Sequence, residues 1–132
     1  MRLRHTLAAL GVAGSLLAVA TPAQANQNPC PSGIGGSVAC FYYSPYLEGA
    51  YHVYYQYNGD VPDQSGDKFG GYGAGSGQGV RNNAASVQNT SSSRFVFVYY
   101  SPNYGGPREQ VNTNDWINLT TLRNNNASFK WW

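Results

Sequence analysis

The chain carries one pattern twice, and this repeat limits what it can fold into. Residues 41–49 read FYYSPYLEG, and residues 98–106 read VYYSPNYGG. A second motif follows each of them, RNNAASV at 81–87 and RNNNASF at 123–129. Two motifs that recur in the same order indicate an internal duplication. We therefore expect two structurally equivalent halves.

Short runs of aromatic and β-branched residues occur in both halves, separated by Gly, Asn, Pro and Ser. Such runs are typical of strands, and helix signals are nearly absent after residue 25. The predicted strands are 38–43, 50–57, 86–88, 95–100, 108–111, 115–119 and 128–131. Each half, about 38–89 and 95–131, then forms a Greek-key motif, whose single sheet cannot bury its apolar face alone. The sequence thus predicts an all-β domain of two Greek-key motifs packed as a sandwich.

The first 25 residues have the pattern of an export signal. Arg2 and Arg4 form a basic start, 6–20 is an apolar run, and 21–25 supplies small residues for cleavage. The apolar run has about 15 residues, short of the roughly 20 of a membrane span. The sequence therefore predicts a signal peptide at 1–25 and one secreted, extracellular domain at 26–132, with no membrane attachment after cleavage.

The net charge of the predicted mature domain bears on its partners, and its two cysteines bear on its stability. Arg2 and Arg4 leave with the signal, so six Lys and Arg face six Asp and Glu in 26–132. A formal charge of zero gives no reason to expect nucleic acid as a partner. Cys30 and Cys40 are the only cysteines, and export favours a disulfide between them. A ring this short is worth about 3 kcal/mol in the chain-entropy model.

The repeated residues resemble the signature of the βγ-crystallin family, an aromatic residue, four residues, an aromatic residue, one residue and Gly. The matching positions are Tyr99, Tyr104 and Gly106 in the second half, and Tyr42, Leu47 and Gly49 in the first, where Leu replaces the second aromatic residue. The resemblance implies a βγ-crystallin-like sandwich over about 38–131.

A second family pattern, Asn/Asp-Asn/Asp-x-x-Ser/Thr-Ser, also resembles residues of both halves. The matching positions are Asn82, Asn83 and Ser86, and Asn124, Asn125 and Ser128. The resemblance implies that each Ser hydrogen-bonds the folded hairpin of its own half.

The N-terminal residues of the predicted domain resemble one particular family of secreted proteins. Cys-Pro-Ser-Gly at 30–33 and Cys-Phe-Tyr at 40–42, directly after a signal peptide, resemble the Streptomyces metalloproteinase inhibitor family (peptidase inhibitor family 36). This resemblance implies a secreted inhibitor of extracellular metalloproteases. We expect it to act as a monomer that presents a loop to the protease cleft. An enzyme is not expected, because His52 is the only His of 26–132 and no catalytic motif accompanies it. We expect that no cofactor is required.

The two halves differ most in one long loop. Gly49 and Ser86 lie 37 positions apart, whereas Gly106 and Ser128 lie 22 apart. The excess falls in 58–79, which contains eight glycines. An ordered loop could meet a partner, and the candidate contact residues are Asp60, Asp63, Asp67, Phe69 and Tyr72. The alternative is a disordered insertion, because polyglycine loses much conformational entropy on ordering.

Two further functions remain open at this stage. Oxygen atoms of Asn82, Asn83, Asn124 and Asn125 could hold calcium, which would make the protein a calcium-binding or a purely structural crystallin-like domain. The final Ser of the family's calcium pattern is replaced by Val87 and Phe129, however, and Asn lacks the charge of Asp. The less favoured function is cell-wall glycan binding by exposed members of Tyr51, Tyr54, Tyr55 and Tyr57.

Overall fold

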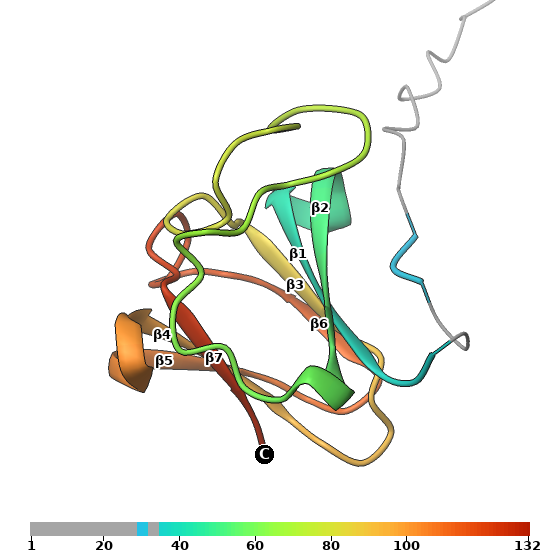
Figure 1. Ribbon diagram of the computed structural model, residues 1–132, viewed down its shortest axis with the longest axis vertical. Coiled ribbons are helices and arrows are strands. Elements are labelled where there is room, and N and C mark those ends of the chain that lie inside the picture. Colours follow the sequence, from blue (N-terminus) through green and yellow to red (C-terminus); the bar gives the residue numbers. More distant parts are fainter. Residues whose placement is uncertain (1–28, 32–34) are drawn as a thin grey trace, which may run out of the picture.

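The computed structural model describes residues 29–31 and 35–132, so the predicted signal peptide lies outside the described residues (Figure 1). Seven strands form two antiparallel sheets, and neighbouring strands within each are hydrogen-bonded in the orders β2-β1-β3-β6 and β5-β4-β7. The first sheet contains β1 (Val38–Ser44), β2 (Glu48–Tyr55), β3 (Ser86–Asn89) and β6 (Asp115–Asn118). The second contains β4 (Val96–Ser101), β5 (Gly105–Val111) and β7 (Ser128–Trp131). The all-β prediction is confirmed.

The two repeated hairpins have the same backbone shape. Each places a short 3-10 turn between its strands, η1 (Pro45–Leu47) in the first and η3 (Pro102–Tyr104) in the second. A further such turn, η2 (Gln56–Asn58), follows β2. Gly49 and Gly106 end the two hairpin turns with φ of 77° and 74°, a left-handed conformation that favours glycine. The repeated Gly is therefore required by the turn.

The two motifs exchange their third strands. β6 comes from the second half but pairs with β3 of the first, where Ile117 faces Val87. In the opposite direction, Val61 of the first half pairs with Phe129 in β7 through two backbone hydrogen bonds of 3.0 Å. The expectation that each half forms its own sheet is therefore wrong in this detail. The exchange lets each half cover an edge that the other would leave unpaired.

The core lies between the two sheets and is rich in aromatic rings. Phe41 of β1 contacts Tyr54 of β2 edge-on at 5.3 Å and Phe129 of β7 at 5.2 Å between ring centroids. Aromatic pairs at this spacing add to the free energy of burial. Phe41 and Phe129 are fully buried, so the sheets pack face to face as the sequence predicts. None of the helical turns in the described part of the chain has the length and apolarity of a membrane-spanning segment.

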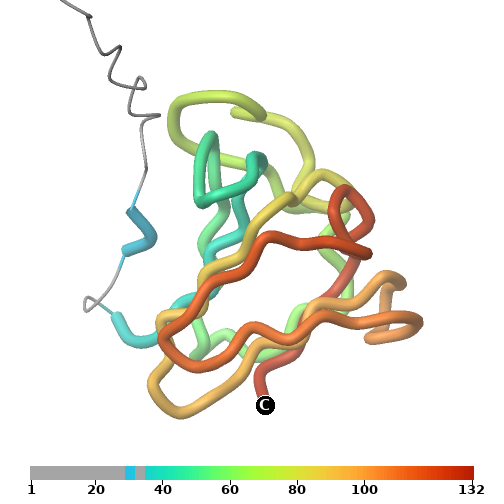
Figure 2. Tube along the Cα trace, turned by 180° about the vertical axis from the view of Figure 1, so that it is seen from behind, coloured from blue at the N-terminus to red at the C-terminus, as the bar shows by residue number. Residues whose placement is uncertain are grey.

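A smaller apolar cluster covers the outer face of the first sheet. Cys30, Val38, Cys40 and Tyr42 are buried there, and the Cys30–Cys40 disulfide joins them with a Cα–Cα distance of 5.9 Å. The disulfide prediction is thereby supported. The described N-terminal residues run along this face, on the side of the molecule away from the β4–β5 hairpin (Figures 1 and 2). The disulfide therefore holds the start of the domain against β1.

Candidate functional site

Two buried serines fasten the two hairpins. The Oγ of Ser86 donates to the Ser44 carbonyl at 2.7 Å and accepts the Leu47 N–H at 3.0 Å. Ser128 repeats this arrangement, with 2.7 Å to the Ser101 carbonyl and 3.1 Å from the Tyr104 N–H. Each serine thus bonds the hairpin of its own half, as the resemblance implies.

The signature aromatic residues lie beside these serines, on the outer faces of the two sheets. Tyr42 stacks on Tyr51 at 5.3 Å, and Tyr99 contacts Tyr104 edge-on at 5.9 Å. Leu47 packs against the same outer cluster as Tyr42. The repeated residues therefore have structural roles in holding the hairpins.

The two Asn-Asn turns meet each other. The Asn82 N–H donates to the Asn126 carbonyl at 2.8 Å, and the Asn124 N–H donates to the Ala84 carbonyl at 2.9 Å. Asn82 and Asn124 both adopt a left-handed conformation, with φ of 63° and 58°. These reciprocal bonds join the halves across the pseudo-twofold relation of the duplication.

The donor atoms in these turns fit calcium poorly. The side-chain amide of Asn83 donates to the Gly79 and Arg81 carbonyls at 2.9 and 3.3 Å, and that of Asn125 donates to the Arg123 carbonyl at 3.2 Å. All four asparagines are neutral, whereas calcium sites are usually built around carboxylates.

Neither the replaced serine positions nor carboxylate clusters supply the missing donors. Val87 and Phe129 are fully buried in the core and carry no oxygen atom in their side chains. Residues 29–31 and 35–132 also contain no cluster of three His, Cys, Asp or Glu side chains suited to a metal ion.

The long loop is held by backbone hydrogen bonds. Tyr51 of β2 exchanges two bonds with Gly70, at 3.3 and 2.9 Å, and the Ala50 N–H donates to the Ala74 carbonyl at 2.9 Å. Within the loop, Lys68 pairs with Gly79 as a short hairpin. Both views show the loop closing over the end of the β1–β2 hairpin (Figures 1 and 2). These bonds give the loop one defined conformation, which agrees with the ordered one of the two alternatives that the sequence left open.

The five candidate contact residues of this loop have different surroundings. Phe69 is 1% exposed and meets Tyr43 edge-on at 5.8 Å, so its prediction as a partner contact is wrong. Burial of its ring against β1 anchors the loop instead. Tyr72 is 89% exposed. Asp60 accepts the Trp131 N–H at 2.9 Å, and Asp63 accepts the Ser65 N–H at 2.9 Å.

A buried polar network joins the start of the loop to the second motif. The Tyr54 hydroxyl donates to Asp67 at 2.6 Å and accepts from the Gln64 amide at 3.3 Å. The Oε1 of the Gln64 side chain accepts from the Asn126 side-chain amide at 2.9 Å. Burial raises the pKa of the Tyr54 hydroxyl above its ordinary value, and the bond to Asp67 raises this pKa further. Sequence reasoning missed Gln64 and Asn126, because their contact spans 62 positions and belongs to no motif.

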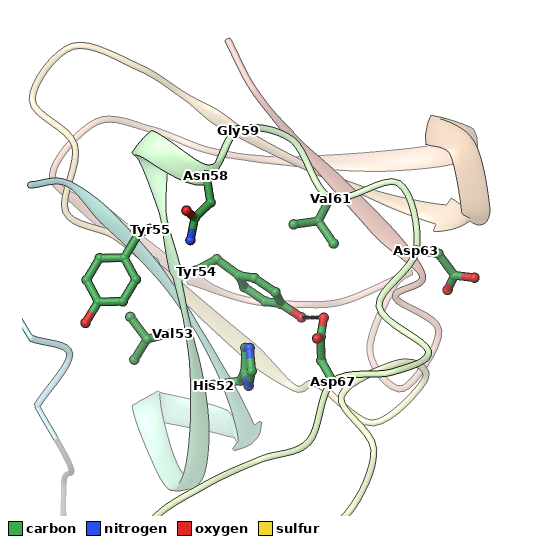
Figure 3. Close-up of a pocket in the computed structure, with 9 residues that line it drawn as sticks. All are labelled: His52, Val53, Tyr54, Tyr55, Asn58, Gly59, Val61, Asp63 and Asp67. Carbon is green, nitrogen blue, oxygen red and sulfur yellow. Dashed lines mark hydrogen bonds between the residues drawn. The ribbon is translucent and has the colours of Figure 1, made fainter.

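A cavity of about 330 Å³ lies between β2 and the beginning of the loop (Figure 3). His52 and Tyr54 point into it from β2, and Asp63 and Asp67 lie on its other side. The His52 Nδ1 is 2.8 Å from the Lys68 carbonyl, so it donates there. The nine described residues that line the cavity include no Ser, Thr, Cys or Lys.

The four β2-region tyrosines of the glycan hypothesis do not share one face. Tyr54 is buried in the core, and Tyr51 and Tyr55 pack on the outer cluster of the first sheet. Tyr57 is 71% exposed and stacks on Tyr55 at 5.2 Å. Alternation along the strand therefore places Tyr54 on the opposite face from Tyr51, Tyr55 and Tyr57, so the buried Tyr54 ring cannot take part in stacking on a sugar.

Comparison with known proteins identifies the fold. No protein-family model matches the sequence, and no curated protein sequence matches it. A structure described under "Evolution of the eye lens beta-gamma-crystallin domain fold" aligns with a TM-score of 0.59 and 16% identity, over 77% of this chain and 92% of that one. The N-terminal domain of protein S aligns with a TM-score of 0.54 and 17% identity, over 72% and 94% of the two chains.

A third structure agrees with the first two. A βγ-crystallin from an Archaea has a TM-score of 0.51 and 16% identity, over 74% of this chain and 99% of that one. Identities this low bear on fold alone, and the resemblance to the metalloproteinase inhibitor family is carried by sequence motifs alone. Strand order, paired serines and these neighbours together show that the protein has the βγ-crystallin fold.

Proposed function

We propose that the protein is a secreted inhibitor of extracellular metalloproteases that acts as a monomer and performs no catalysis. One observation carries the proposal. The glycine-rich segment 70–77 is bonded to β2 through Tyr51 and Ala50, and it presents Tyr72 with 89% of its surface exposed. A loop that is ordered before it meets its target loses less entropy on binding.

The surroundings of Tyr72 support a role as an interface anchor. Gly71 and Gly73, with φ of 80° and 106°, flank it on both sides, so the backbone there can lie close to a partner's surface. An exposed aromatic side chain on a fixed backbone is a common centre of binding energy. The fold supplies the rigid frame, and affinity comes from shape complementarity.

Titration of the secreted protein against a thermolysin-type metalloprotease tests the proposal. We expect inhibition at micromolar concentration or below, and a loss of at least tenfold in affinity for Tyr72→Ala. Tyr57→Ala is the matched control, because Tyr57 is also exposed, at 71%, but lies outside the loop. Absence of inhibition at micromolar concentration would exclude this target class. Equal losses in both variants would exclude the loop as the contact.

The second candidate is a calcium-binding or purely structural crystallin-like domain. The neutral Asn donors described above favour a purely structural domain over a calcium-binding one. Thermal unfolding with calcium and with a chelator separates the two, because a cation that binds only the native state raises the unfolding midpoint. A glycan-binding function, the third candidate, predicts retention on insoluble cell-wall polysaccharide.

A further inference from the structure

β2 is an edge strand, and part of its outer edge has no backbone partner. Tyr51 uses both its N–H and its C=O on Gly70. Alternate residues of a strand direct these groups to the same side, so Val53 and Tyr55 also face away from β1. The Gln56 N–H, one position farther on, donates to Ser37 beside β1, which agrees with this alternation. No described residue pairs with the backbone groups of Val53 or Tyr55 along this edge.

The gap exists because the loop leaves β2 for the other sheet. Gly70 lies beside Tyr51, but earlier in the chain Val61 pairs with Phe129 in β7. The Lys68 carbonyl between them is bonded by the His52 side chain. The strand edge and the departing chain therefore enclose the cavity of about 330 Å³, which Val53 and Tyr55 help to line (Figure 3). An added strand would lie about 4.8 Å from β2.

The far wall of this cavity favours a positive charge. Asp63 forms an ion pair with Arg81 at 3.4 Å. Asp67 has no ion pair within the described residues and accepts a hydrogen bond only from Tyr54. A side chain opposite Tyr54 in an added strand would point to the same face as Tyr54, and so toward Asp67. A basic side chain complements that carboxylate.

We propose that the free edge of β2 binds an extended peptide segment as an added antiparallel strand, with a Lys or Arg opposite Tyr54. The backbone of Val53 and Tyr55 supplies the hydrogen bonds, and Asp67 selects the basic side chain. Strand addition of this kind obtains affinity from the main chain and specificity from alternate side chains. The site is separate from the 70–77 loop, so it goes beyond the proposed inhibitory function and does not depend on it.

A blocked pentapeptide, Thr-Val-Lys-Val-Thr, tests the proposal by titration into isotope-labelled protein. We expect chemical-shift changes centred on the amides of Val53 and Tyr55. In the proposed pairing, each valine of the peptide exchanges hydrogen bonds with β2, whereas the lysine N–H points away. N-methylation of either valine should therefore weaken binding about tenfold or more, and N-methylation of the lysine should leave it unchanged.

Charge selection is tested with a second pair of reagents. Replacement of the peptide lysine by norleucine should weaken binding severalfold. Asp67→Asn should remove that difference, because the variant lacks the negative charge. Asparagine keeps an oxygen that can accept from the Tyr54 hydroxyl, so the bond to Tyr54 can remain. Asp115→Asn, at an exposed position of β6, is the matched control and should keep the preference for lysine.

Four results would overturn the proposal. The first is no shift at Val53 and Tyr55 at millimolar peptide, and the second is equal binding of all three N-methyl peptides. The third is equal binding of the lysine and norleucine peptides to the unmodified protein, which removes the basic residue from the proposal. The fourth is a concentration-dependent shift of the same amides without peptide, which would assign the edge to a second copy of the chain.

Discussion

Gly75 lies against the phenol ring of Tyr43, so closely that an added Cβ would overlap the ring atoms. Tyr43 also contacts Phe69, and the loop thereby covers a ring of β1. Tyr100 is the equivalent residue of the second half, where no long insertion exists, and it is 47% exposed. The glycine-rich insertion therefore shields one hairpin that its duplicate leaves open.

Substitution of Gly75 should release the loop. Gly75→Ala must displace either the Tyr43 ring or the loop backbone, and we expect a loss of about 1–3 kcal/mol in unfolding free energy by urea titration. Gly77→Ala is the control. Its φ of +81° is close to the +84° of Gly75, but nothing lies within 4 Å of its added Cβ. Equal losses in the two variants would mean that backbone strain, and not the Tyr43 contact, requires the glycine.

The paired serines should contribute similarly to stability. Ser86→Ala and Ser128→Ala each leave a hairpin carbonyl and N–H without their buried partner, so each should lose about 1–3 kcal/mol. Ser92→Ala, at an exposed loop position, should change stability by less than about 0.5 kcal/mol. Chemical unfolding measures all three, and a silent Ser128→Ala would show that the two motifs are not energetically equivalent.

Reduction of the Cys30–Cys40 disulfide should loosen the outer cluster of the first sheet before the main core. We expect the unfolding free energy to fall by about 3 kcal/mol in the chain-entropy model. Amide exchange should accelerate at β1 and β2 more than at β4 and β7, because the cluster packs only on the first sheet. The double variant Cys30→Ala with Cys40→Ala should match the reduced protein, and uniform acceleration in both sheets would contradict this account.

Stability should fall in alkaline solution. Burial raises the pKa of Tyr42 and of Tyr54 above the ordinary value of 10.0, so both hydroxyls keep their protons in the folded chain after the unfolded chain has lost them. The unfolded state then binds fewer protons, and the unfolding free energy decreases as pH rises above about 10, by up to about 1.4 kcal/mol per pH unit for each tyrosine. Below that range these groups cause no change.

The alkaline loss can be assigned with single substitutions. Tyr54→Phe should reduce the slope of unfolding free energy against pH above about 10 by the share of one tyrosine. Tyr57→Phe, at a residue that is 71% exposed, should leave the slope as it is. If both variants give the same slope of unfolding free energy against pH as the unmodified protein, Tyr54 does not contribute to the alkaline loss.

Calcium should leave the thermal midpoint of the protein unchanged at millimolar concentration. The Asn82 and Asn124 turns offer neutral donors, and Val87 and Phe129 are buried where the family pattern has serine. A cation that does not bind the native state cannot shift its unfolding. A midpoint that rises with calcium and falls back to its original value with chelator would contradict the conclusion that these turns fit calcium poorly. It would favour the calcium-binding alternative.

Local sequence patterns were enough to predict the strands and the hairpins. The repeated SPYLEG and SPNYGG segments marked both turns, and the predicted strands at 86–88 and 128–131 agree closely with β3 and β7. The disulfide and the serine bonds also followed from motifs. These features depend on residues close in sequence or on a repeat that can be read directly.

Long-range arrangements were not predictable in the same way. The pairing of Val61 with Phe129 depends on which sheet edge a segment reaches, and alternation along a strand does not encode that choice. The glycine content of the 58–79 loop left order and disorder open as alternatives, because the contact of Gly75 with Tyr43 becomes visible only in three dimensions. The free edge at Val53 was likewise hidden, since it results from the path of a loop.

The exchange of third strands has a consequence for the evolution of this chain. A gene encoding one motif would not produce a half-sized version of the domain, because β3 would lose β6 and β7 would lose Val61. Such a product would expose unpaired edges and be prone to aggregation. Two single-motif chains could satisfy both edges by trading these segments, so a chain that carries both motifs holds covalently what would otherwise need an association between two molecules.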